Sequence, residues 1–71
     1  MKIETKEYPE VNGRYRHYKG GEYLVITLAK HTETSEELVI YKSISFGTVY
    51  ARPLSMWFDQ IDSGIKRFSR M

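Results

Sequence analysis

The amino-acid sequence predicts a mainly β fold, a small SH3-like barrel of about five strands with a short helical turn near the C-terminus. Its 71 residues, 41% of them hydrophobic, suffice for one small core and leave no room for a second domain. Short runs of β-branched and aromatic residues alternate with turn residues, at the spacing typical of small barrels. An OB-like barrel is the alternative, although such barrels are usually longer and carry their helix in mid-chain.

The first half of the domain is expected to form a hairpin. Residues 1–12 carry alternating charges and predict a partly ordered N-terminal arm, so that the single domain covers residues 13–71. Arg14 to Tyr18 predicts a short strand. The two glycines that follow suit a tight turn, because glycine adopts positive φ without steric cost. The strongest predicted strand comes next, from Tyr23 to His31.

The strand from Tyr23 to His31 has an apolar face that we expect to form the core. This face carries Leu24, Ile26 and Leu28, followed by Lys30. The opposite face is uncharged until His31. Both faces are therefore expected to be covered at least in part, as in a strand that bends between the two sheets of a barrel.

The second half is expected to add two strands, a helical turn and a last strand. Leu38–Tyr41 and Thr48–Arg52 predict strands on either side of a break at Gly47. Pro53 ends strand pairing, because proline has no N–H to donate and suits the first turn of a helix. Ile65 to Phe68 predicts a last short strand before a basic tail. The apolar stripe of the helical turn is Leu54, Trp57, Phe58 and Ile61.

Composition and charge exclude several classes of function. No cysteine is present, which excludes disulfides, thiolate zinc sites, iron–sulfur clusters and a cysteine nucleophile. Eleven Lys and Arg against nine Asp and Glu give a net charge of +2, which permits nucleic-acid binding without demanding it. No apolar run approaches the roughly 20 residues that span a bilayer, and the N-terminus lacks the apolar run of a signal peptide. We therefore expect a cytoplasmic protein that does not bind membranes.

Four blocks of the sequence resemble a bacterial family of small proteins, the domain of unknown function DUF1653. The first block runs from Gly13 to Tyr23 and has the pattern G-x-Y-x-H-Y-K-G. The others are Ala29-Lys30-His31-Thr32-Glu33-Thr34, Leu38-Val39-Ile40-Tyr41 and Arg52-Pro53-Leu54-Ser55-Met56-Trp57. The resemblance covers about residues 13 to 68 and implies an SH3-type barrel. It implies no activity, because the family has none assigned.

Two positions depart from the family's pattern. Tyr50 stands where the family tends to have Trp two residues before Arg-Pro, and Lys66 stands where it tends to have Pro before Arg-Phe. Both changes keep an aromatic or cationic character. They affect only roles that need an indole at position 50 or a rigid turn at position 66.

The two histidines of the chain, His17 and His31, could form a metal site together with Glu33. Such a site requires that the first two strands place both imidazoles on one face, which the glycine hairpin permits. A spacing-defined motif such as H-E-x-x-H is absent. The simpler interpretation is that each histidine bonds a nearby backbone or carboxylate group, so we expect no metal and no cofactor.

Catalysis would draw on the same residues. A histidine oriented by a carboxylate, as His31 could be by Glu33, can act as a general base. No nucleophile accompanies it, since the sequence has no G-x-S-x-G motif and no cysteine, and no glycine-rich loop could hold a phosphate. We assign no catalytic residue, and a structural turn is the favoured interpretation.

The first predicted strand carries the densest mixture of cations and rings in the chain. Arg14, Arg16 and Tyr18 share one face, with Tyr15 and His17 on the other. Two arginines and a ring could neutralise phosphates and stack on bases, as in single-strand-binding barrels, and RNA binding is therefore the alternative function. Solvated charges on an outer face also need no ligand. The C-terminal cations that could extend this surface are Lys66, Arg67 and Arg70.

The preferred function is a non-catalytic binding module with an aromatic, histidine and arginine surface. Besides packing in the core, tyrosines such as Tyr50 could form with His31 and Arg52 an aromatic-lined groove that takes a peptide. An arginine in an aromatic neighbourhood usually has a carboxylate partner, and Glu33 is the internal candidate for Arg52. We expect a protein or peptide partner, and a monomer or weak homodimer. The candidate binding residues are Arg14, Tyr15, Arg16, His17, Tyr18, Tyr23, His31, Glu33, Tyr41 and Arg52.

Overall fold

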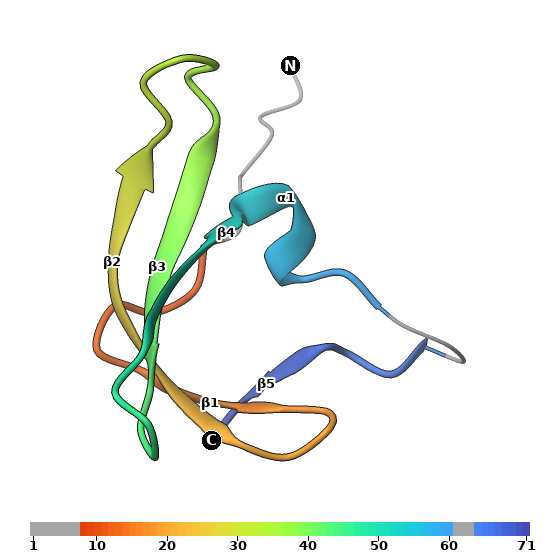
Figure 1. Ribbon diagram of the computed structural model, residues 1–71. Coiled ribbons are helices and arrows are strands. Elements are labelled where there is room, and N and C mark those ends of the chain that lie inside the picture. Colours follow the sequence, from red (N-terminus) through yellow and green to blue (C-terminus); the bar gives the residue numbers. More distant parts are fainter. Residues whose placement is uncertain (1–7, 61–63) are drawn as a thin grey trace.

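The computed structural model describes residues 8–60 and 64–71, which form an antiparallel β-sheet and one helical turn (Figure 1). The prediction of a mainly β fold with five strands and a late helical turn is confirmed for these residues. In chain order the elements are β1 (Arg14–His17), β2 (Glu22–Lys30), β3 (Glu37–Ser43), β4 (Val49–Pro53), α1 (Leu54–Trp57) and β5 (Phe68–Arg70).

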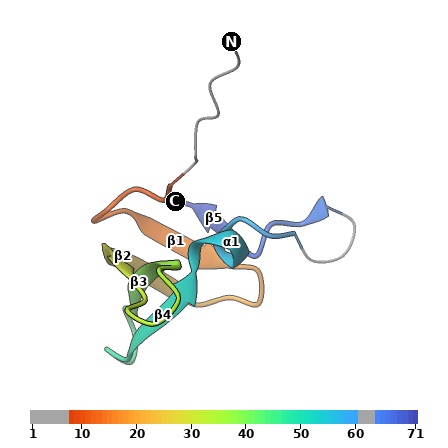
Figure 2. The same ribbon diagram turned by 90° about the horizontal axis from the view of Figure 1, so that it is seen from above.

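The sheet is strongly curved and has two free edges. Its strand order is β4-β3-β2-β1-β5, so β4 and β5 are the edge strands. Seen from above, α1 lies between the β2–β3–β4 side and the β1–β5 side of the sheet (Figure 2). The barrel that the sequence predicts is therefore only a loose description, because the strands do not pair all the way round and β4 and β5 do not pair with each other.

The core face of β2 differs from the prediction. Val25 is completely buried, whereas Ile26 and Leu28 of the predicted core face are exposed. The register explains why Val25 is buried and Ile26 is not, because Val25 lies opposite the buried Tyr41 and so shares its face. A bulge between Val25 and Thr27 then shifts the register of the strand, and one extra residue exchanges the two faces of a strand.

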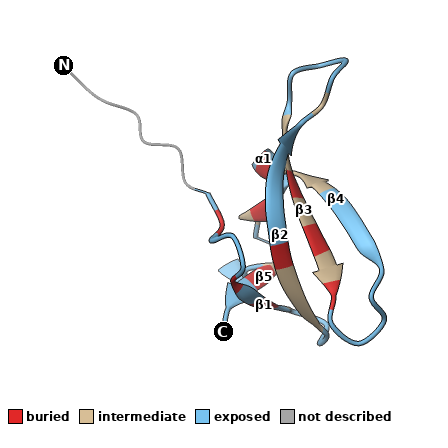
Figure 3. Ribbon diagram, turned by 90° about the vertical axis from the view of Figure 1, so that its left-hand side faces the viewer, coloured by how far each residue is buried: buried red, intermediate tan, exposed pale blue. Residues whose placement is uncertain are grey.

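The core is built mainly from aromatic rings on the concave side of the sheet. Trp57, the last residue of α1, is 1% exposed and stacks on Phe68 of β5 with ring centroids 4.2 Å apart and an interplanar angle of 5°. Tyr15 of β1 and Tyr41 of β3 meet the same indole edge-on, at 5.4 and 5.2 Å. The buried positions of β3 alternate along the strand, as Figure 3 shows. One tryptophan therefore connects α1 to three strands.

The N-terminal arm is described only from Tyr8, since residues 1–7 of the predicted 1–12 arm lie outside the described residues. The described part is bonded to the sheet. The Asn12 amide donates to the Val25 carbonyl at 2.7 Å, and the Glu10 amide donates to the Tyr15 hydroxyl at 2.8 Å. The β1–β2 turn is the glycine hairpin expected, with φ of 93° at Gly20 and 87° at Gly21.

The helical turn and the last strand have different bounds from those predicted. α1 ends at Trp57, and the residue that follows, Phe58, has left the helical region with ψ of 9°. Ile61 of the predicted stripe lies outside the described residues. The last strand was expected at Ile65–Phe68. It begins at Phe68 instead, because residues 68 to 70 are those that pair with β1.

The position of Trp57 makes a direct prediction about stability. Trp57→Ala removes the ring that joins α1 to three strands, and it should lower the free energy of unfolding by about 3–5 kcal/mol. The neighbouring Met56→Ala is the matched control, since Met56 is 46% exposed and should change stability by less than about 0.5 kcal/mol. Urea unfolding followed by far-UV circular dichroism measures both, and similar shifts for the two variants would contradict the central role of Trp57.

Candidate functional site

The strand register brings aromatic and basic side chains to the concave side of the sheet. Residues opposite each other in antiparallel strands share a face. The register pairs His17 with Phe68, Tyr41 with Tyr50, and Val39 with Arg52. We call the outer layer of this side the concave aromatic face. It consists of His17, Tyr18, Tyr23, Tyr50 and Arg52, and it packs on the buried Phe68.

Tyr23 lies at the centre of the concave aromatic face. Its ring meets Tyr41 and Phe68 edge-on, with centroids 5.5 and 5.8 Å away. His17 and Tyr50 flank it at 6.3 Å each. These distances and edge-to-face angles are those that aromatic pairs prefer, so the rings form one packed layer and hold each other in place.

Arg52 enters this aromatic layer from β4 without a carboxylate partner. Its guanidinium carbon lies 5.8 Å from the Phe68 ring centroid, and its Nε donates a hydrogen bond to the Met56 carbonyl at 3.2 Å. No ion pair involves Arg52 within residues 8–60 and 64–71. The pair expected with Glu33 is therefore not formed, and the charge of Arg52 is left without an opposite charge in that part of the chain.

The surroundings of His17 are cationic. Burial lowers the pKa of His17 below its ordinary value, and the nearby charges of Arg67, Arg52 and Lys19 lower it further. Arg67 itself is held by Asp59, which accepts a hydrogen bond from Arg67 Nε at 3.1 Å. Burial also raises the pKa of the Tyr41 hydroxyl, with Arg52 acting in the opposite direction. The site therefore presents neutral rings and positive charges.

The two histidines do not come together. His17 ends β1, beside the start of β2, whereas His31 follows the end of β2. At about 3.3 Å per residue, the nine residues of β2 separate them by most of the length of the sheet. Nδ1 of His31 accepts a hydrogen bond from the Glu33 amide at 3.1 Å, which closes the hairpin turn locally. Within residues 8–60 and 64–71, no three His, Cys, Asp or Glu residues are grouped to hold a metal ion.

The predicted nucleic-acid face of β1 is only partly assembled. Arg14 and Arg16 are exposed and share one face, but Tyr18 lies beyond the strand and packs beside His17, with centroids 4.6 Å apart. Arg16 forms an ion pair with Glu22 at 3.5 Å. The turn after His17 therefore moves Tyr18 from the arginine face to the concave aromatic face.

Two candidate binding residues belong to the core instead. Tyr15 and Tyr41 are buried, at 6% and 7% exposure. The Tyr15 hydroxyl accepts the Glu10 amide, and both rings pack on Trp57. These two rings can only pack beneath a surface site, so a ligand on the surface would not contact them directly.

Local patterns in the sequence do not indicate that Phe68 supports the site. Phe68 touches His17 at 5.0 Å and carries Arg52 over its ring only because β5 pairs with β1. The pairing of chain ends is a non-local contact that a local pattern does not reveal. A second feature missed is Phe46, in the β3–β4 turn, which is 86% exposed.

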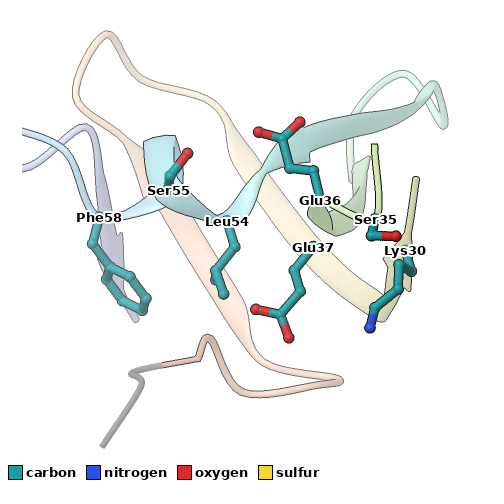
Figure 4. A pocket seen from close by; sticks show the side chains of 7 residues that line it. All are labelled: Lys30, Ser35, Glu36, Glu37, Leu54, Ser55 and Phe58. Carbon is teal, nitrogen blue, oxygen red and sulfur yellow. The ribbon is translucent and has the colours of Figure 1, made fainter. Parts of the chain in front are cut away.

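A separate pocket of about 560 Å³ lies between the β2–β3 hairpin and α1 (Figure 4). Leu54 and Phe58 supply its apolar wall. The polar groups do not converge, because Figure 4 shows the Glu36 carboxylate and the Ser55 hydroxyl pointing away from Leu54 and Glu37. Since a ligand site needs a few polar groups aimed at one point, we place the candidate site at the concave aromatic face. The residues that line the separate pocket are Lys30, Ser35, Glu36, Glu37, Leu54, Ser55 and Phe58.

The fold and the site define a small domain with one curved antiparallel sheet and an aromatic face around an arginine. A family described as "Protein of unknown function (DUF1653)" matches residues 13–70, and the chain belongs to this family. The crystal structure of a DUF1653 protein from Bordetella bronchiseptica is similar, with 36% sequence identity, 82% coverage of each chain and a TM-score of 0.72. None of the curated proteins compared with the chain matches it. No helix among the described residues is long and apolar enough to cross a membrane.

The lowered pKa of His17 predicts a pH dependence of stability. The folded state disfavours the protonated imidazole relative to the unfolded chain, whose histidine pKa is near 6.5. The unfolded state therefore binds more protons below that pH, and stability should fall as the pH drops through this value. Thermal unfolding midpoints measured at successive pH values should show a smaller loss for His17→Gln. The two proteins are first compared near pH 8, where the histidine is about neutral in both states, and parallel curves below pH 6.5 would contradict the prediction.

Proposed function

We propose that this chain is a non-catalytic binding module whose concave aromatic face holds a carboxylate-bearing segment of a protein partner. Arg52 would bind the carboxylate, and the rings around it would contact the neighbouring side chains of the partner. The absence of a cysteine and of a nucleophile motif in the sequence supports a binding role over a catalytic one.

The observation that carries the proposal is the unpaired charge of Arg52. A guanidinium on an aromatic ring is pre-organised, and its planar fork matches a carboxylate. Arg52 is half-buried against Phe68 and has no carboxylate partner within the described residues. Partial burial makes the missing opposite charge more costly, and a ligand could supply it.

The exposed rings of the concave aromatic face suit a protein partner. Tyr50 is 42% exposed and Tyr18 39% exposed, so each offers a ring face and a polar tip to a ligand. Large, rigid amphipathic side chains of this kind are enriched where proteins bind each other, together with arginine. Because the rings are packed on one another, they lose little side-chain entropy when a partner binds.

Single-stranded RNA remains the alternative ligand, with weaker support. Several of the cations that would neutralise phosphates are engaged within the chain. Arg16 pairs with Glu22, Arg67 with Asp59, and Arg70 with Glu10 at 3.1 Å. RNA binding depends mainly on phosphate contacts, so these internal ion pairs favour a partner that needs one principal cation.

The proposal predicts that Arg52→Ala impairs binding while Arg14→Ala does not. Arg14 is the matched control, since it is an exposed arginine on the opposite face of the sheet. Binding of fluorescein-labelled random peptides rich in Asp and Glu, followed by fluorescence anisotropy, should weaken at least about tenfold in Arg52→Ala, because a charge-assisted hydrogen bond is lost.

A labelled single-stranded RNA serves as the competing probe in the same assay. Tight, strongly salt-dependent RNA binding that requires Arg14 and Arg16, with no binding of acidic peptides, would overturn the proposal. Equal peptide binding by the wild-type protein and Arg52→Ala would overturn it as well.

A further inference from the structure

The β4 edge strand runs along the concave aromatic face and pairs on one side only. β4 is the first strand in the order β4-β3-β2-β1-β5, with β3 as its single neighbour. Figure 3 shows β4 at the margin of the sheet, exposed over its first half. The opposite edge, β5, is a strand of three residues. A free strand edge presents unpaired N–H and C=O groups, which are a template for another strand.

The hydrogen-bond pattern identifies which backbone groups of β4 face outward. The Ser43 amide donates to the Thr48 carbonyl at 2.9 Å. Hydrogen-bonded pairs alternate in an antiparallel ladder, so Tyr50 and Arg52 point their backbone groups to β3, and Val49 and Ala51 point theirs outward. By the same alternation the backbone groups of Pro53 point outward, which suits a residue that has no N–H to donate to β3.

The side chains along this edge follow the same alternation. Tyr50 and Arg52 lie on the concave side, opposite Tyr41 and Val39. Val49 and Ala51 lie on the convex side and are exposed. At the end of the edge, Phe46 projects from the β3–β4 turn. A strand laid along β4 would therefore have one charged and aromatic side and one apolar side available to it.

The charged side chains of this region are all positive. From Leu38 to Phe58 the sequence contains no Asp or Glu, whereas Lys42 and Arg52 are both present. A second copy of the chain that paired through its own β4 would bring no carboxylate to Arg52, because its β4 has none. An acidic peptide from another protein supplies what this edge lacks, so charge complementarity favours it over a dimer.

We propose that an extended acidic peptide adds to β4 as an outer strand of the sheet. The peptide backbone pairs with the outward groups of Val49 and Ala51. An Asp or Glu side chain then reaches Arg52, and an aromatic or aliphatic side chain two positions away packs on Tyr50, since alternate residues of a strand share a face. This mode, addition of a strand to a sheet edge, takes its affinity from main-chain hydrogen bonds and its specificity from the alternate side chains. The inference rests on the proposed function and specifies its partner.

The test uses a phage library of random linear peptides selected on the full chain. Selection should enrich peptides with an acidic residue two positions from an aromatic or aliphatic one. Ala51→Pro removes one outward N–H, at a position where the β3–β4 ladder does not use it, and should weaken a selected peptide roughly tenfold. Ala51→Ser keeps the N–H and is the matched control. In the free protein the Ala51 amide should exchange rapidly with solvent, and the bound peptide should protect it.

The outcomes separate this inference from the proposed function. Peptides that require Arg52 but bind Ala51→Pro as tightly as wild type, with no protection of the Ala51 amide, would overturn strand addition and leave the carboxylate site standing. Failure to select any acidic peptide would overturn both. A self-associating chain whose dimer is broken by Ala51→Pro would show that a second copy, and not a peptide, occupies the edge.

Discussion

The stack of Trp57 on Phe68 is the contact on which the rest of the fold depends. β4 and β5 are the two edges of the sheet and share no ladder. α1 follows β4 directly, and its last residue, Trp57, lies flat on the first residue of β5 at 4.2 Å. The indole and the phenyl ring therefore join the two ends of an open sheet, where a closed barrel would use backbone hydrogen bonds. Tyr15 and Tyr41, packed edge-on against the same indole, fix the curvature between those ends.

This way of closing the fold also creates the candidate site. Because the sheet ends meet through side chains, the buried rings that join them support a more exposed layer of rings on the concave side, and β4 keeps a free edge beside this layer. Phe68 has one face on Trp57 and carries Arg52 5.8 Å from its ring centroid. The core and the candidate site are thus two layers of one aromatic cluster. A ligand on the outer layer would be held by residues whose positions the core already fixes, which is how pre-organised sites are built.

Local sequence patterns predicted the strands, the glycine turn and the helical turn, because each depends on residues close together in the chain. They failed where a partner strand decides the outcome. Leu24, Ile26 and Leu28 form the more apolar face of β2, but the bulge and the pairing of Val25 with Tyr41 select the other face at the start of the strand. Of the candidate residues, Arg52, Tyr18 and Tyr23 lie on the concave aromatic face, whereas Tyr15 and Tyr41 lie in the core. His31 was expected beside Arg52, where the structure has His17. The pairing of β1 with β5 puts His17 there, and no local pattern contains that pairing.

We propose that a partner's carboxylate binds at the guanidinium of Arg52, which has no carboxylate partner among the described residues. The Arg52 Nε–H group already donates to the Met56 carbonyl at 3.2 Å, so its NMR signal reports the surroundings of the guanidinium directly. The most direct measurement is the shift of this signal during titration with an acidic peptide. We expect a saturable shift of the Arg52 signal together with the ring signals of Tyr23 and Tyr50. Shifts confined to the pocket around Lys30 and Ser55, with the Arg52 signal unchanged, would contradict it.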